Sequence, residues 1–554
     1  MLYLRMLLFF LSFIGIYLFI KKIIKIDEKI VLPISIISIT LCLYVFSIFS
    51  ILKIGYYLCF ISGLVFLLYF VFKKEINYKK IISIDNILLF ILLIYIIFIT
   101  RELHYFHYDN YTHWSLIIRL ILENGNLPKT LDVLSFPLYP PGTALFVSFF
   151  SFICNNSNDG IFIIAQNIII LSFIKGIINL LKTDNVNLKR ILFVLFYFFM
   201  QAFVVAFNDL LVDNVLVLVS LFIIMCILSY KEDSKKLFVI LALSLTYLYF
   251  VKNAGFVLAF FFILLFYKQT HKSSKAFYLL ALVFGAYFSW NAFAVITYGP
   301  DCMRTKHALN IGASMQMLKG KGIINCIKYY ARYLLEIFDF KFIPNILFWI
   351  INVLLIIMLV VLRKHIKEEL KTILKVDLIY LLYFLGLGFV YIFSMTINES
   401  NYYACYERYM MVPIVLMIFY LIYVAIKDKN KCKIIVYCLC LFVGIIFNIN
   451  NLKPFIGIDG YKGSRMDKYD RLIQNVDISN KKVGIYTLDN NYDDFLFCYS
   501  IYRLRNKDFA IIDNSNIFYY DILDMAIVFD NLDSIESDLL ERGYYKIDEY
   551  IYSR

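Results

Sequence analysis

Residues 87–114 read ILLFILLIYIIFITRELHYFHYDNYTHW. Residues 87–100 form an uncharged apolar run, and the polar stretch that follows is rich in His and Tyr. An uncharged run that approaches ~20 residues is typical of a helix that crosses a bilayer. Because apolar runs and short polar loops alternate in this way along most of the chain, the sequence predicts a polytopic α-helical membrane protein.

The composition excludes most other classes of protein. Hydrophobic residues make up 62% of the 554 residues and charged residues 17%, against about 45–50% and about 25% in soluble chains. A soluble enzyme, a disordered chain and a coiled coil are therefore excluded. The net charge of +13 does not indicate a nucleic-acid partner, because Lys and Arg cluster between apolar runs as cytoplasmic anchors do. The eleven Cys form no CxxC pair, so neither a zinc site nor a disulfide framework is expected.

The expected fold has about 14 transmembrane helices, one for each apolar run of near-spanning length. The runs lie at residues 2–20, 30–50, 54–72, 87–100, 161–181, 191–207, 210–230, 237–250, 254–267, 276–298, 343–362, 376–397, 410–426 and 434–449. Basic clusters lie at alternate ends of these runs, and the positive-inside rule places the clusters in the cytoplasm. The loops 101–142 and 299–342 then face outward. We interpret the short run 143–154 as a re-entrant or interfacial segment.

Three parts follow from this pattern: N-terminal transmembrane helices over 1–86, a main transmembrane part over 87–450, and an extracytoplasmic tail over 451–554. In the tail the apolar runs shrink to strand length and alternate with polar, helix-like stretches, which predicts a small α/β domain. The predicted strands lie at 483–487, 509–512, 525–529 and 544–547. We expect a multi-pass protein of the cell membrane (plasma or inner membrane).

Asp109 and His113, in the first outward loop, are candidate catalytic residues. They are four positions apart and share one face of a helix. A carboxylate at a wet membrane surface is ionised, which suits a base that takes a proton from an alcohol as the alcohol attacks. The three His and one Asp between residues 104 and 113 match no defined metal spacing.

Asp209 and Lys252 lie in short turns on the same predicted side. A carboxylate at the edge of a bilayer is costly and usually functional, so Asp209 is a third candidate catalytic residue. Asp209 and Asp109 are also the candidate ligands of a divalent cation. The alternative role of Asp209 is that of a helix N-cap. Lys252 is a lone lysine on the outward side, and a phosphate at the membrane surface would pair with it. Alternatively, its side chain snorkels to the lipid headgroups.

Three more residues complete the candidate substrate-binding set with Lys252. They are Tyr139 in the Tyr-Pro-Pro-Gly segment, Arg304 in the second long outward loop, and Arg408 before the run 410–426. The two arginines add cations on the side that carries the acids.

The ordered set resembles a known superfamily. An outward Asp109, Tyr-Pro-Pro at 139–141, Asp209, Lys-x-x-Gly at 252–255 and Arg-Tyr at 408–409 are similar to the GT-C integral membrane glycosyltransferases, especially the protein mannosyltransferase and aminoarabinose transferase families. The resemblance spans roughly residues 87–450, which would then be a GT-C-like catalytic module.

This resemblance implies a sugar donor carried on polyprenyl phosphate and an extracytoplasmic acceptor, which is a glycan, a lipid or a protein. Asp109 would be the general base of an inverting transfer, and Asp209 would orient the acceptor or share a cation with Asp109. Lys252 and Arg408 would hold the phosphate as it leaves.

Other functions compete with this expectation. A surface-polysaccharide polymerase or ligase would also use outward loops and lipid-linked sugars. A lipid-linked sugar flippase or transporter would need charged residues along a path through the membrane, often on broken helices. The conspicuous charges of this chain instead lie at one predicted surface.

The topology predicts that reporter proteins fused after Arg363 and after Asn451 lie on opposite sides of the membrane. The first fusion follows a basic cluster and should give a cytoplasmic signal, and the second should give an extracytoplasmic one. A cytoplasmic signal from both fusions would contradict the assignment.

Overall fold

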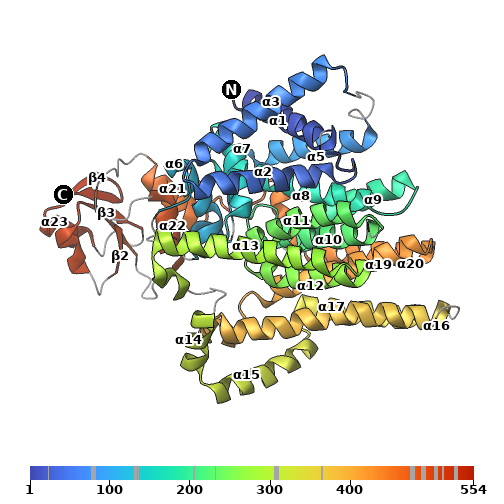
Figure 1. The fold of residues 1–554 in the computed structure, drawn as a ribbon. Helices are drawn as coiled ribbons and strands as arrows, with labels where there is room; N and C mark the ends of the chain where they lie inside the picture. Colours follow the sequence, from blue (N-terminus) through green and yellow to red (C-terminus); the bar gives the residue numbers. More distant parts are fainter. Residues whose placement is uncertain are drawn as a thin grey trace.

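The computed structural model of the chain describes residues 1–554 except 23, 77–82, 106, 130–133, 135, 204–205, 231, 305–310, 363–365, 475–480, 488–493, 505–508, 514–516 and 530–534. The described chain is mostly helical and ends in a small α/β unit (Figure 1). The expected helical fold with a small C-terminal sheet is therefore confirmed.

The apolar helices form one bundle, shown in Figure 1 from blue to orange. They are α1 (Leu2–Lys22), α2 (Val31–Ile48), α3 (Leu52–Phe72), α5 (Ile84–Ile99), α8 (Asp159–Asn179), α9 (Val186–Phe203), α10 (Asp213–Ser229), α11 (Ser234–Val251), α12 (Ala254–Thr270), α13 (Ser273–Tyr298), α16 (Ile343–Leu362), α17 (Ile366–Phe393), α19 (Tyr406–Lys427) and α20 (Lys431–Phe447). Among the described residues, nine helices are long and apolar enough to cross a membrane, or up to eleven if each of two bent pairs is one span. These helices indicate a multi-pass membrane protein.

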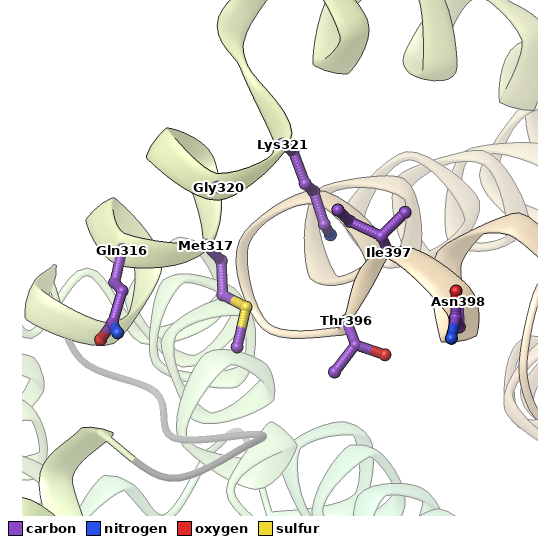
Figure 2. Close-up of a pocket in the computed structure, with 7 residues that line it drawn as sticks. All are labelled: Gln316, Met317, Gly320, Lys321, Thr396, Ile397 and Asn398. Carbon is purple, nitrogen blue, oxygen red and sulfur yellow. The ribbon is translucent and has the colours of Figure 1, made fainter.

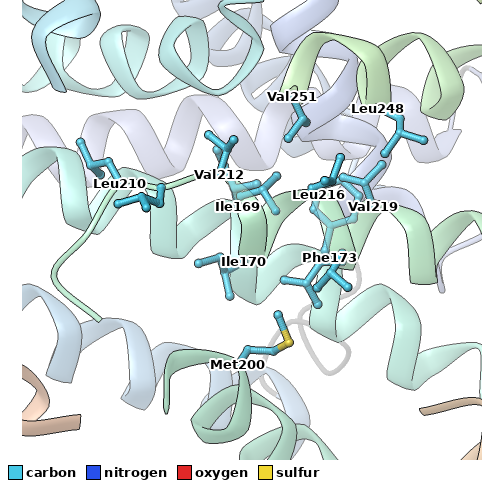
Figure 3. Packing of buried hydrophobic residues seen from close by; sticks show 14 of the residues in the cluster. Ile169, Ile170, Phe173, Met200, Leu210, Val212, Leu216, Val219, Leu248 and Val251 are labelled. Atoms are coloured by element: carbon cyan, nitrogen blue, oxygen red, sulfur yellow. The ribbon is translucent and has the colours of Figure 1, made fainter. Parts of the chain in front are cut away.

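The centre of the bundle is built from helices that are apolar on all sides. α8 is buried along nearly its whole length and packs against α2, α7, α9 and α10. Figure 3 shows Ile169, Phe173, Met200, Leu216 and Leu248, which are buried side chains of this core from α8, α9, α10 and α11. By contrast α3 and α5 expose many apolar side chains, as expected for helices that face lipid.

Basic residues from different loops gather at one end of the bundle. Lys22 at the end of α1 pairs with Glu75 after α3, and Arg190 in α9 pairs with Asp85 in α5. Lys236 in α11 lies 3.6 Å from Asp27, in the turn before α2. Four of the basic loops that the sequence places in the cytoplasm, near residues 21–29, 73–80, 182–190 and 231–236, therefore share one end of the fold.

The opposite end, here called the loop end, carries the connecting helices. They are η1 (Thr100–Glu102), η2 (Asn110–Trp114), α6 (Ser115–Asn124), α7 (Gly142–Cys154), η3 (Pro300–Arg304), α14 (Ile311–Lys321), α15 (Ile323–Leu335), η4 (Glu336–Phe338), α18 (Ile397–Asn401) and η5 (Ile449–Ile456).

The short helix α7 does not connect the two ends of the bundle. A Cβ atom at Gly142, its first residue, would lie 2.5 Å from the carbonyl oxygen of Phe250, near the end of α11. In its second turn, the Ser148 hydroxyl lies 2.6 Å from the hydroxyl of Tyr56, in the first turns of α3. Both contacts are at the loop end, so α7 runs along that end.

The C-terminal unit is a five-stranded sheet with order β2-β1-β3-β5-β4. Its elements are α21 (Arg465–Ile473), β1 (Val483–Tyr486), α22 (Asp494–Leu504), β2 (Phe509–Ile512), η6 (Ile517–Ile522), β3 (Met525–Val528), α23 (Glu536–Glu541), β4 (Tyr545–Asp548) and β5 (Ile551–Ser553). The first three strands are parallel, and β5 pairs antiparallel with both β3 and β4. Figure 1 places this unit at the loop end, with its helices α21 and α22 nearest to α6.

Candidate functional site

Asp109, Arg408, Asp213 and Lys252 form a row of alternating charges, here called the charge chain. Nη1 of Arg408 donates a hydrogen bond of 3.0 Å to Oδ2 of Asp109, and Nε of the same guanidinium lies 3.5 Å from Oδ2 of Asp213. Nζ of Lys252 donates to Oδ1 of Asp213 at 2.8 Å. The structure thus joins three of the predicted site residues through a carboxylate outside the predicted set.

Three helix termini that meet at the loop end position the charge chain. Asp213 is the first residue of α10, where the helix dipole favours a negative charge. Lys252 directly follows α11, and Arg408 lies in the first turn of α19. The ring of Tyr409 lies next to both cations, with its centroid 4.7 Å from Nζ of Lys252 and 5.3 Å from Cζ of Arg408. These cation–π contacts hold the two positive groups side by side.

Burial makes the charge chain electrostatically strong. Asp213 is 2% exposed, and Lys252 and Asp109 are each 8% exposed. A carboxylate at this depth is costly unless cations pair with it. The two carboxylates and the two cations of the charge chain balance each other's charge. An anion that enters must therefore compete with Asp109 or Asp213 for the cations.

Asp209 fixes the stretch of loop that carries Asp109. Its Oδ1 accepts hydrogen bonds from the backbone N–H of His107, at 2.9 Å, and from Nδ2 of Asn110, at 2.8 Å. Asn110 in turn accepts from the backbone N–H of Leu210 at 2.9 Å. This reciprocal set ties the residues on both sides of Asp109 to the turn before α10, so Asp209 acts on the position of Asp109.

His113 lies in an aromatic wall beside Asp109. Its ring is 1% exposed and meets the ring of Tyr139 edge-on at 5.1 Å, while Tyr139 stacks on Trp114 at 5.4 Å. Burial lowers the pKa of His113 to about 3, although the Asp109 carboxylate acts in the opposite direction. His113 is therefore neutral at pH 7, and Tyr139 presents a ring close to the general-base candidate.

Two predicted features are not assembled in the described residues. Arg304 ends η3, and its side chain lies outside the described residues. Among the described residues, no three His, Cys, Asp or Glu side chains are grouped as metal ligands. Asp109 faces a guanidinium and Asp209 faces N–H donors, so the pair considered for a divalent cation is occupied by protein groups.

A separate cavity of about 410 Å³ lies between α14 and α18 and is lined by Gln316, Met317, Lys321, Thr396 and Asn398, among others (Figure 2). Nζ of Lys321 donates to the carbonyl oxygens of Tyr391 and Ile392 and to the Ser400 hydroxyl. Lys321 therefore binds carbonyl groups in the last turn of α17. No residue of the charge chain lines this cavity.

Asp213 and Asn110 take part in the contacts of this candidate site but are missing from the predicted set. Asp213 is the one carboxylate within the run 210–230, and a lone acid inside an apolar run is the signal that marks it. Nothing in the sequence marks Asn110, because its partners lie about one hundred residues away.

A comparison with family models, with curated proteins and with solved structures finds no match for the chain.

The buried neutral His113 predicts a specific pH dependence of stability. The unfolded chain binds a proton at this position below about pH 6.5, whereas the folded chain does not until about pH 3. Stability is therefore lost as pH falls below about 6.5, by roughly 2 kcal/mol between pH 7 and pH 5 from this residue.

Thermal unfolding of the purified protein at several pH values measures this effect. His113→Leu should show a smaller loss of melting temperature on acidification than the wild type. His271→Asn, at an exposed position in the loop after α12, is the matched control and should behave as the wild type does. Identical pH profiles for wild type and His113→Leu would contradict the burial of a neutral imidazole.

Proposed function

We propose that this chain is a membrane glycosyltransferase of GT-C type that moves a sugar from a polyprenyl-phosphate donor to an acceptor hydroxyl with inversion. The observation that supports it is the charge chain, in which a carboxylate lies beside two buried cations at one end of an apolar bundle. A phosphate diester needs cations, and an attacking hydroxyl needs a base. The charge chain offers both within one set of contacts.

Lys252 and Arg408 are the phosphate-binding groups of this proposal. The bond from the anomeric carbon to the phosphate oxygen breaks, and its electron pair stays on the polyprenyl phosphate, which gains one negative charge. Cations that are held in place beforehand stabilise such a charge most in the transition state. The Tyr409 ring and the Asp213 carboxylate hold both cations in place.

Asp109 is the general base. It accepts the proton of the acceptor hydroxyl as that oxygen bonds to the anomeric carbon, on the face opposite the departing phosphate. In the described structure the Asp109 carboxylate is paired with Arg408. A donor phosphate that attracts this guanidinium would free the carboxylate, so the base would become available when the donor is bound.

The neighbouring residues take supporting roles. Asp209 holds the backbone around Asp109 through His107 and Asn110, and we assign it a positioning role toward the acceptor site. The stacked rings of Tyr139 and Trp114 supply an apolar face for a sugar ring. Arg304 remains a candidate substrate-binding residue from the sequence alone.

The same proposal includes the finer topology. About fourteen crossings, with the basic end in the cytoplasm and the loop end outside the cell membrane, would place the charge chain and the C-terminal unit on the extracytoplasmic side. Residues of the charge chain gather at one end of the bundle, which favours a reaction at the membrane surface over transport through it. A polysaccharide polymerase or ligase would use the same donor chemistry with a different acceptor.

The test separates binding from transfer. Asp109→Asn should lower the rate of sugar transfer by roughly 10²–10⁴-fold, as general-base loss does. Polyprenyl phosphate alone should bind this variant at least as tightly as the wild type, because Arg408 loses a competing carboxylate. Lys252→Ala should instead weaken that binding by about 10- to 100-fold, the value of a lost charge-assisted hydrogen bond.

Both measurements use the purified chain in detergent, with polyprenyl phosphate for binding and polyprenyl-phosphate hexoses and pentoses with crude envelope acceptors for transfer. Glu102→Gln, an exposed acid in the same loop, is the matched control and should leave both values unchanged. Transfer by Asp109→Asn near the wild-type rate would remove Asp109 from the mechanism and make Asp209 the next candidate base.

A further inference from the structure

A second polar cavity lies at the loop end and shares no lining residue with the charge chain. Its volume is about 570 Å³, and its wall includes Lys53, Arg119, Glu123, Phe152 and Asn156. These residues come from the start of α3, the middle and end of α6, the last turn of α7 and the turn between α7 and α8. We call it the Lys53 cavity. Its size is that of a site for a small ligand or a headgroup.

The stem of the exposed Lys53 side chain lies against Gly125. A Cβ atom at Gly125 would lie 2.2 Å from Cε and 2.9 Å from Nζ of Lys53, so the lysine stem lies directly on this glycine. Gly125 has φ of +66° and ends α6 in the left-handed conformation that favours glycine. In the part of the chain that the structure describes, no carboxylate pairs with Lys53. The exposed ammonium thus lies at the rim of a cavity whose wall also contains the Glu123 carboxylate, and an anion can reach it from solvent.

Arg119 adds a second cation at the base of the cavity. It is 7% exposed, and its Nη2 donates to Oδ1 of Asp159 at 2.8 Å. Its Cζ lies 4.1 Å from the ring centroid of Tyr502, in α22 of the C-terminal unit. Nε of Arg119 has no hydrogen-bond partner within the described residues. The guanidinium is therefore bound to Asp159 through Nη2, and its Nε remains able to donate a further hydrogen bond.

The wall of the cavity continues onto a lipid-facing surface. Phe152, which lines the cavity, meets the ring of Tyr57 edge-on at 5.3 Å. Tyr57 begins an exposed apolar face of α3 that continues with Ile61, Val65 and Leu68. α3 is one of the helices long and apolar enough to cross a membrane. A ligand with an anionic head and apolar chains fits both surfaces at once.

We propose that the Lys53 cavity binds the phosphate headgroup of an anionic phospholipid, with its acyl chains along the exposed face of α3. Lys53 and Arg119 face the phosphate, and the side-chain amide of Asn156 lies in the wall that surrounds the rest of the headgroup. Because Arg119 also contacts Tyr502, the bound lipid would strengthen the attachment of the C-terminal unit. The site does not depend on the glycosyltransferase proposal.

Native mass spectrometry of the full chain in neutral detergent tests the site. Phosphatidylglycerol should bind more tightly than phosphatidylcholine, and Lys53→Ala should weaken phosphatidylglycerol binding about fivefold, the effect of one lysine near an anionic lipid. Lys53→Arg keeps the charge and should retain the lipid. Lys73→Ala, an exposed lysine at the other end of α3, is the matched control and should bind as the wild type does.

Three results would overturn the proposal. The first is unchanged phosphatidylglycerol binding in a folded Lys53→Ala, or an equal loss in Lys73→Ala. The second is binding of glycerol 3-phosphate as tight as that of the lipid, because the ligand would then be a soluble polar molecule such as an acidic saccharide. The third is a Lys53-dependent preference for polyprenyl phosphate, which would make the cavity a second site for the donor lipid.

Discussion

The structure depends above all on the buried carboxylate of Asp213 and the two cations that share it. Removing one partner from a buried ion pair typically costs about 3–5 kcal/mol, because the remaining charge is left without compensation. Asp213 and Arg408 lie in the first turns of α10 and α19, and Lys252 directly follows α11, so this requirement brings three helix ends together at one place. Through Arg408 the same requirement also holds the loop that carries Asp109. We propose that this network, which joins three helices and a loop, also recognises a substrate charge, because an anion would change how its cations are shared.

The first long loop is held from the other side by the C-terminal unit. The backbone N–H of His104 donates to Oδ2 of Asp459 at 2.9 Å, and its ring stacks on Tyr461 at 3.6 Å. Near the start of α6, the hydroxyls of Ser115 and Tyr502 lie 2.9 Å apart, and the Tyr502 hydroxyl also donates to Asp159. The loop between His104 and Ser115 therefore lies between the bundle and the tail. A tail without a residue of the charge chain therefore contacts the loop that carries Asp109 on both sides of this residue.

Much of this fold follows from local sequence, and most of the site does not. Apolar runs specify helices and strands directly. The run at 483–487 forms β1, and the apolar run at 54–72 forms α3, which exposes many apolar side chains. The last strand, β5, is three residues long and escapes prediction, because pairing with β3 and β4 stabilises it. Asp109, Lys252 and Arg408 can be selected because each is a charge in an unusual place. Their joint partner Asp213 and the loop anchor Asn110 depend on contacts between distant segments, which one sequence does not encode locally.

The most direct test of the central claim is an experimental structure of the full chain with a bound polyprenyl phosphate, for example by electron cryomicroscopy in lipid nanodiscs. The account predicts the phosphate within hydrogen-bond distance of Nζ of Lys252 and the Arg408 guanidinium, with Arg408 drawn away from Asp109. A phosphate bound elsewhere, with the 3.0 Å contact between Arg408 and Asp109 intact, would contradict it.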